Sequence, residues 1–360
     1  MKTTMSMKRN QWYLIVLSIF LATLNGQANQ SDNTQKKEIN KSFSVSVGGK
    51  LVVDNRYGNV TVTYWSKNEV SLRVVVEANA RTEGDAKEKL DQIDIQMQKS
   101  GNTVYAETSI KNLSNNGGNN RINIDYYINI PSKFAVDISQ KYGSIYLPEK
   151  NMGRCTLSIK YGNIHAGSFT LPLSIEAGYS DINIDDVQDL RMDLSYCRNV
   201  EMKNGKNLNI DSKYSNLNIG NIEKLKLEKK YGNLTVQSVD KVLMAIKYSK
   251  MKIRYLKEEL DIDGLNYSTL TVNELSSDFK RVRAESRYGT LNLSIPANTS
   301  FNVNATNMKY GELKVKDFNI TRSNIENKVN YYYQINGGSS HRVVNFKGYN
   351  HSNLNIKTSS

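Results

Sequence analysis

The stretch KKYGNLTV, Lys229 to Val236, recurs in variant form along most of the 360-residue chain. From the second to the ninth member of the series, neighbouring tyrosines are 17 to 19 residues apart, and a constant period of this length indicates a repeat architecture. KGYNHSNLNI around Tyr349 is a looser twelfth member, and the eleven closer ones are centred on Tyr57, Tyr142, Tyr161, Tyr179, Tyr196, Tyr214, Tyr231, Tyr248, Tyr267, Tyr288 and Tyr310.

Apolar residues alternate with polar ones on both sides of each tyrosine. In one repeat Leu225 and Leu227 precede the tyrosine, and Leu234 and Val236 follow it. This period of two is typical of strands, and the change of parity between the two stretches indicates a corner. A unit of about 18 residues cannot bury its apolar face alone, so we expect the repeats to stack with parallel pairing, about 4.8 Å apart. The sequence predicts an all-β protein, a parallel β-helix.

The residue after the tyrosine is always small. Such a position is one where the backbone turns tightly or another backbone approaches closely. We interpret the repeated pair as a structural corner, with the tyrosine ring inward and its hydroxyl reaching water, although a row of aromatic rings could also stack on sugars. The members of this corner ladder are Tyr142, Tyr161, Tyr179, Tyr196, Tyr214, Tyr231, Tyr248 and Tyr267, with Gly143, Gly162 and Gly232 among the small residues.

The two ends of the chain differ from the repeats. The pattern of residues 1–28 predicts a secretory signal peptide, because cations precede an apolar run. That run has about 13 residues and is too short to span a bilayer. Residues 29–135 predict a first repeat and a partly antiparallel N-terminal cap. One short helix is expected there, because Thr82 and Asp85 form a capping-box pattern before DAKEKLDQI, with Ala86 and Leu90 at helical spacing. Residues 136–320 predict the β-helix repeats, and residues 321–360 a C-terminal repeat and cap.

Two cysteines, Cys155 and Cys197, belong to an exported chain in which disulfides could form. In the predicted stack they lie two repeats apart, roughly 9.6 Å along the axis. A disulfide needs Cα atoms within about 7 Å. We therefore predict two free thiols.

Basic residues precede most of the tyrosines. They belong to a chain of net charge +13, of which about +10 remains after residues 1–28 because these hold three cations and no acidic residue. On an outer face this basic ladder would attract polyanions, whereas the alternative is that charged flanks only keep a strand-rich rod soluble. Its members are Arg56, Lys141, Lys160, Lys213, Lys230, Lys247, Arg287 and Lys309.

The sequence contains no recognisable catalytic, cofactor or metal motif. His165, His341 and His351 lack a metal-ligand spacing, and no nucleotide-binding or nucleophile-elbow pattern is present. Glycoside hydrolysis would need two carboxylates across a cleft. The candidates are clustered in or beside turns, where calcium binding is a further alternative: Asp181, Asp185, Asp186, Asp189, Asp261 and Asp263.

The opening GGKLVVDNRYGNVTVTYW from Gly48 and the serial KYGN, KYSN and RYGT repeats resemble the bacterial putative adhesin family with a head GIN domain. This resemblance covers nearly all of the chain after residue 28. It implies a right-handed β-helix and a location in the periplasm or on the outer surface of a Gram-negative-type cell envelope. It does not imply a mechanism.

Two functions of different class follow. In the first, a non-enzymatic rod binds polysaccharide, lipopolysaccharide or another anionic surface through the basic ladder. In the second, a periplasmic structural or sensing module contacts an envelope protein through its caps and through the loop of residues 111–121. Nucleic acid is not expected as a partner, because the predicted export and the single basic residue per repeat argue against it.

Overall fold

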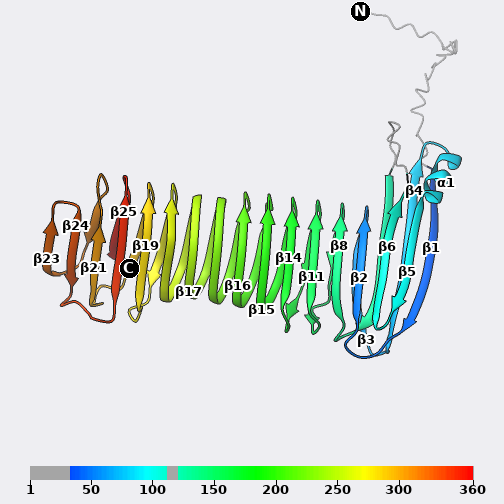
Figure 1. Cartoon of the computed structure of the whole chain (residues 1–360), viewed down its shortest axis with the longest axis horizontal. Coiled ribbons are helices and arrows are strands. Elements are labelled where there is room, and N and C mark those ends of the chain that lie inside the picture. The colour runs from blue at the N-terminus through cyan, green and yellow to red at the C-terminus, as the bar shows by residue number, and fades with distance from the viewer. Residues whose placement is uncertain (1–32, 112–120, 360) are drawn as a thin grey trace, which may run out of the picture.

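The computed structural model describes residues 33–111 and 121–359. The predicted signal peptide and residues 112–120 of the loop after Lys111 lie outside this part of the chain. The described chain is all-β, as predicted: its strands form one sheet of 26 strands, arranged as a long row with a single helix at one end (Figure 1). Within the described residues, no helix has the length and apolar character needed to cross a membrane.

The middle of the row consists of strands that pair in parallel, one repeat apart. Leu157 lies opposite Ile175, and Ile175 lies opposite Met192, and all three are buried. The strands of this region are β8 (Ala135–Lys141), β9 (Ile145–Tyr146), β10 (Lys150–Asn151), β11 (Cys155–Lys160), β12 (Asn163–Ala166), β13 (Ser168–Phe169), β14 (Leu173–Gly178), β15 (Asp181–Ser195), β16 (Val200–Lys213), β17 (Leu217–Asn266) and β18 (Thr269–Leu275). Strict in-register pairing places equivalent residues of successive repeats in columns along the row.

Several glycine corners lie directly against the corner of the preceding repeat. A Cβ atom built on Gly162 would be 1.7 Å from the carbonyl oxygen of Gly143, and one on Gly232 would be 2.3 Å from that of Ser215. The predicted reason for small residues, a close backbone approach, is therefore confirmed. Where serine occupies the position, its hydroxyl joins neighbouring repeats: Ser215 Oγ accepts the amide N–H of Cys197 at 2.9 Å and donates to the carbonyl oxygen of Lys213 at 2.9 Å.

The N-terminal end of the row is the partly antiparallel cap. β1 pairs antiparallel with β4, β4 with β7 and β5 with β6, whereas β2 and β3 pair in parallel with the repeats. The predicted helix is confirmed, with Thr82 as its N-cap and Ala86 and Leu90 buried. The elements are β1 (Asn33–Ser44), β2 (Lys50–Arg56), β3 (Val60–Trp65), β4 (Glu69–Ala80), α1 (Glu83–Asp91), β5 (Ile93–Ser100), β6 (Thr103–Ile110) and β7 (Arg121–Pro131).

The C-terminal end has an order that the repeat series does not predict. β25 pairs in parallel with both β19 and β21, so the last repeat lies between the repeats of Tyr288 and Tyr310 (Figure 1). The hairpin of β23 and β24 follows β21 and forms the end of the row. The strands are β19 (Arg281–Arg287), β20 (Thr290–Ile295), β21 (Phe301–Thr306), β22 (Leu313–Lys316), β23 (Ile320–Glu326), β24 (Asn330–Ile335), β25 (Val343–Tyr349) and β26 (Asn353–Thr358).

Both cysteines are free, as predicted, and the structure shows that both are buried. Burial raises the pKa of the Cys155 thiol to about 12 and also raises that of Cys197. Because the thiolate is the reactive form, the raised pKa of each thiol disfavours its reaction at neutral pH. Cys155 fills the core, and Cys197 occupies a corner in place of glycine or serine.

Replacing Gly232 with valine tests the corner contact. We expect the free energy of unfolding to fall by about 1 to 3 kcal/mol, because the new side chain meets the Ser215 carbonyl and the residue has a positive φ of 96°. Gly178→Val is the matched control, since a Cβ there has only ordinary contacts at 3.8 Å. Chemical denaturation measures both variants, and equal midpoints would contradict the assignment.

Candidate functional site

The corner tyrosines form one stacked column along the row. From Tyr57 to Tyr288 neighbouring rings have centroids 4.6 to 5.2 Å apart and planes within 17° of parallel. The column continues through His351, which stacks on both Tyr288 and Tyr310. Alignment on Tyr349 missed this histidine, because the inserted last repeat carries one extra residue before its corner. All eleven tyrosines have a φ between 50° and 62°.

The expectation that these rings point inward is wrong. Tyr142 is 41% exposed and Tyr267 is 51% exposed. A left-handed backbone at the tyrosine directs its side chain out of the corner, whereas a count of strand parity assumes an extended backbone. Since each ring face is covered by the next ring, only the edges and hydroxyl groups meet solvent. The column therefore has no free faces on which sugars could stack between its two ends.

The stability of the tyrosine column depends on two opposing effects, the cost of the left-handed backbone and the stabilisation from ring stacking. A positive φ costs an L-residue roughly 1 to 2 kcal/mol. Each aromatic pair contributes about 0.5 to 1.5 kcal/mol beyond area burial, and an inner ring has two such neighbours. Stacking thus offsets the backbone cost at every repeat, provided that the column is continuous.

Tyr214→Ala and Tyr214→Gly separate the two effects. Both variants lose the contacts with Tyr196 and Tyr231, but only glycine relieves the positive φ of 52°. We expect both to be less stable than the wild type, with the alanine variant lower than the glycine variant by about 1 kcal/mol. Unfolding midpoints measure the difference. If the glycine variant were instead less stable than the alanine variant, as is usual at strand positions, this account would be contradicted.

The basic ladder is exposed but interrupted. Lys141 pairs in register with Lys160, and Lys213 with Lys230. Between these two groups the same column is occupied by Gly178 and Ser195, which carry no charge. Arg56 lies opposite Lys141, Lys247 occupies the position after Lys230, Arg287 lies opposite Tyr349, and Lys309 lies over the Tyr310 ring at 5.2 Å. The ladder is thus several short groups and not one stripe.

Some ladder lysines are already engaged. The Nζ atoms of Lys141, Lys160 and Lys230 lie 5.0 to 5.7 Å from the ring centroid of the next residue. Lys213 lies 3.8 Å from the Asp211 carboxylate. These contacts favour the solubilising role of the ladder.

A column of carboxylates was missed by the sequence reasoning. Glu176, Asp193, Asp211 and Glu228 lie in register on successive repeats, three residues before each tyrosine. Like charges directly opposite one another destabilise a sheet. Cations two residues away partly offset this repulsion: Arg191 precedes Asp193, Lys213 follows Asp211, and Lys226 and Lys230 lie on either side of Glu228. A fixed offset from the tyrosine was the signal in the sequence that could have revealed it.

The aspartates considered for catalysis or calcium are already engaged by hydrogen bonds or ion pairs. Asp181 accepts from Arg198 and from the Asn199 amide, Asp185 pairs with Lys203, and Asp186 accepts from Asn204. Arg283 binds both Asp261 and Asp263. Within residues 33–111 and 121–359 no three His, Cys, Asp or Glu side chains form a metal-binding group.

A groove of about 740 Å³ runs along the outer face of the parallel strands, across successive repeats from Arg154 to Arg281. Two of the aspartates, Asp189 and Asp261, line it. They lie four repeats apart, about 19 Å along the axis, which exceeds the roughly 5 to 9.5 Å between the two carboxyl groups of glycosidases. The groove does not bring these carboxylates together as an acid–base pair.

Lys229 is buried beneath a corner and was not singled out from the sequence. It is 3% exposed, and its Nζ donates to Ser212 Oγ at 3.2 Å and to the Ser215 carbonyl oxygen at 2.6 Å. Burial lowers the pKa of Lys229 to about 8. The unfolded chain therefore binds this proton more tightly than the folded protein does.

A methionine at position 229 tests this burial cost. As the pH rises from about 8 to 10.5, the free energy of unfolding of the wild type should increase by roughly 3 kcal/mol, because in this range the Lys229 amine is protonated only in the unfolded chain. The Lys229→Met variant should be the more stable protein at pH 7, and its advantage should shrink as the pH rises. Denaturant unfolding at several pH values measures the difference in free energy of unfolding between the two proteins. A difference that does not change with pH would contradict the prediction.

Comparison with known proteins gives weak likenesses of fold. No protein-family model matches the chain, and no curated protein matches it. Solved structures that it is similar to include a "putative cell adhesion protein" from Clostridium sporogenes (13% identity, 90% of this chain and 100% of that one, TM-score 0.20). Two others are from Parabacteroides distasonis: a "putative adhesin" (9% identity, 72% and 93% coverage, TM-score 0.30) and a "putative lipid binding protein" (13%, 73% and 92%, TM-score 0.28). At these TM-scores the likenesses support no statement about function.

Proposed function

We propose that this protein is an exported, non-enzymatic rod, built as a right-handed parallel β-helix, that binds an anionic glycan or another anionic component of the cell envelope. The right hand follows the general preference of parallel crossover connections. The predicted signal peptide and the resemblance to the head GIN family motivate the location in the periplasm or on the outer surface.

The observation that carries the proposal is the periodic presentation of cations. In-register pairing places exposed lysines and arginines in columns whose members are whole axial steps apart, as for Arg191 and Lys226, which are two repeats apart. A polyanion also carries charge at regular steps, so one chain can meet several cations at once. Such contacts add up even where each exposed pair contributes little.

A second candidate is a structural or sensing module that contacts an envelope protein through its ends. β23, at one end of the row, pairs only with β24 among the described strands, and all seven of its residues are exposed. An open strand edge is a template for a strand of another chain. Charge substitutions on the sides of the rod would leave that contact unchanged.

Binding to alginate, a linear polymer of uronic acids, tests the first candidate. We expect binding by calorimetry at low salt that weakens steeply as sodium chloride rises, because exposed charges are screened over roughly 8 Å at physiological ionic strength. Neutral dextran is the control and should not bind. Failure to bind alginate at low salt, or binding that salt does not affect, would count against an anionic ligand.

A further inference from the structure

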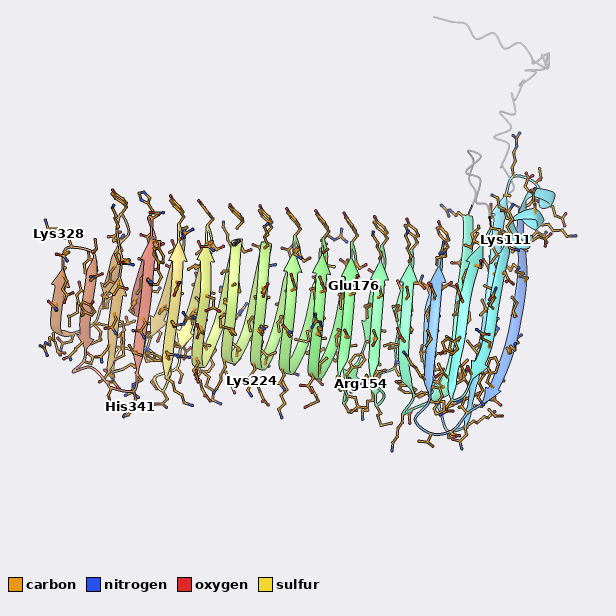
Figure 2. All side chains as sticks on the ribbon, viewed as in Figure 1. Lys111, Arg154, Glu176, Lys224, Lys328 and His341 are labelled. Atoms are coloured by element: carbon orange, nitrogen blue, oxygen red, sulfur yellow. The ribbon has the colours of Figure 1, made fainter. Side chains whose placement is uncertain are left out.

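The groove introduced above has the shape of a trough. Its floor follows the backbone of one buried column, which runs from Cys155 to Val242 over six repeats, about 24 Å. Its walls are the outward side chains one residue before and one residue after each floor residue, roughly 6.7 Å apart along the strand. Figure 2 shows Arg154 and Lys224 of one wall near the same long edge of the row, with Glu176 further along the strands.

One half of the groove carries cations without acidic partners. Arg154, Arg191, Lys224 and Lys226 line it, and in the part of the chain that the structure describes none of them has a carboxylate within 4 Å. Its one carboxylate, Asp189, accepts a hydrogen bond of 2.8 Å from the Asn207 amide. This half is therefore positively charged and open to solvent.

The other half of the groove is neutralised by its own ion pairs. Lys241 lies 3.1 Å from Glu259, and Arg281 lies 3.5 Å from both Glu259 and Asp261. Arg283 adds a further contact with Asp261 at 2.6 Å. Charge recognition is thus confined to the first half, between Arg154 and Lys226.

We propose that this cationic half of the groove binds a linear acidic polysaccharide whose chain lies parallel to the axis of the rod. The inference rests on the proposed function and assigns its binding site. Lys224 and Lys226 would flank the polymer from opposite walls, and Arg191 lies in the wall of Lys226 two repeats away, separated by Asn209. Carboxylates of the polymer pair with these cations, and its hydroxyl groups hydrogen-bond to the Asn209 amide.

The surrounding charges favour a narrow chain over an anionic membrane. The carboxylate column that contains Glu176, Asp193 and Glu228 lies on the same face, two residues beyond the wall of Arg191 and Lys226. A flat anionic bilayer resting on this face would meet those carboxylates, which repel it. A single polymer chain within the groove lies on the far side of the cations from them.

Two triple variants of equal charge test the site. Arg191→Gln, Lys224→Gln and Lys226→Gln remove three cations from the groove, whereas Lys213→Gln, Lys230→Gln and Lys247→Gln remove three from the basic ladder. We expect the groove variant to bind alginate about tenfold more weakly than the wild type and the ladder variant to stay within about threefold. Calorimetry measures both, and unchanged thermal unfolding shows that these exposed substitutions leave the fold intact.

Each other outcome overturns the inference in a distinguishable way. If both variants bound alginate equally weakly, only net charge would matter. If only the ladder variant bound more weakly, the binding site would lie at the basic ladder beside the corner, and the proposed function would stand. A groove variant that loses binding to phosphatidylglycerol vesicles but keeps binding to alginate would identify a membrane site. If the wild type fails to bind alginate at low salt, the proposed function itself fails.

Discussion

The structure depends on the close fit between successive corners. At Gly143 and Gly162 the backbone lies so close to the carbonyl group of the corner before it that no Cβ would fit, and at other corners a small serine or cysteine occupies the same position, so successive repeats keep the spacing of neighbouring β-strands. The in-register columns follow from it. Tyrosine rings stack, serine hydroxyls join adjacent repeats, and charged side chains line up on the outer face, all at the same axial step.

Much of the architecture could be predicted from the sequence, because repetition makes weak local signals add. The period, the alternating apolar residues and the small residue after each tyrosine predicted the stacked strands, and the Thr82 capping pattern predicted the helix. The direction of the tyrosine side chains could not be predicted by counting parity. It depends on a left-handed backbone at a bulky residue, which is uncommon and has no sequence signal of its own apart from the small neighbour.

The candidate site was harder to predict than the fold, for a physical reason. Inward positions are constrained by packing and therefore show a pattern, whereas outward positions tolerate most polar residues. The basic ladder was noticed because its lysines adjoin the tyrosine motif, but the structure shows that Gly178 and Ser195 interrupt it. The groove cations, such as Arg191 and Lys226, are brought together only by the register between repeats. Neither adjacency in the chain nor a motif links them.

The position of the last repeat has a consequence for how the protein reaches its final form. A chain that folds from its N-terminus can add repeats one after another, since each new strand finds its partner already in place. β25 and β26 cannot follow this order, because they lie between strands that precede them in the chain. Until the final residues are available, β19 and β21 have no partner between them. The C-terminal end therefore closes only after the last strands of the chain are available, and a chain truncated before β25 would keep an unfilled gap one strand wide.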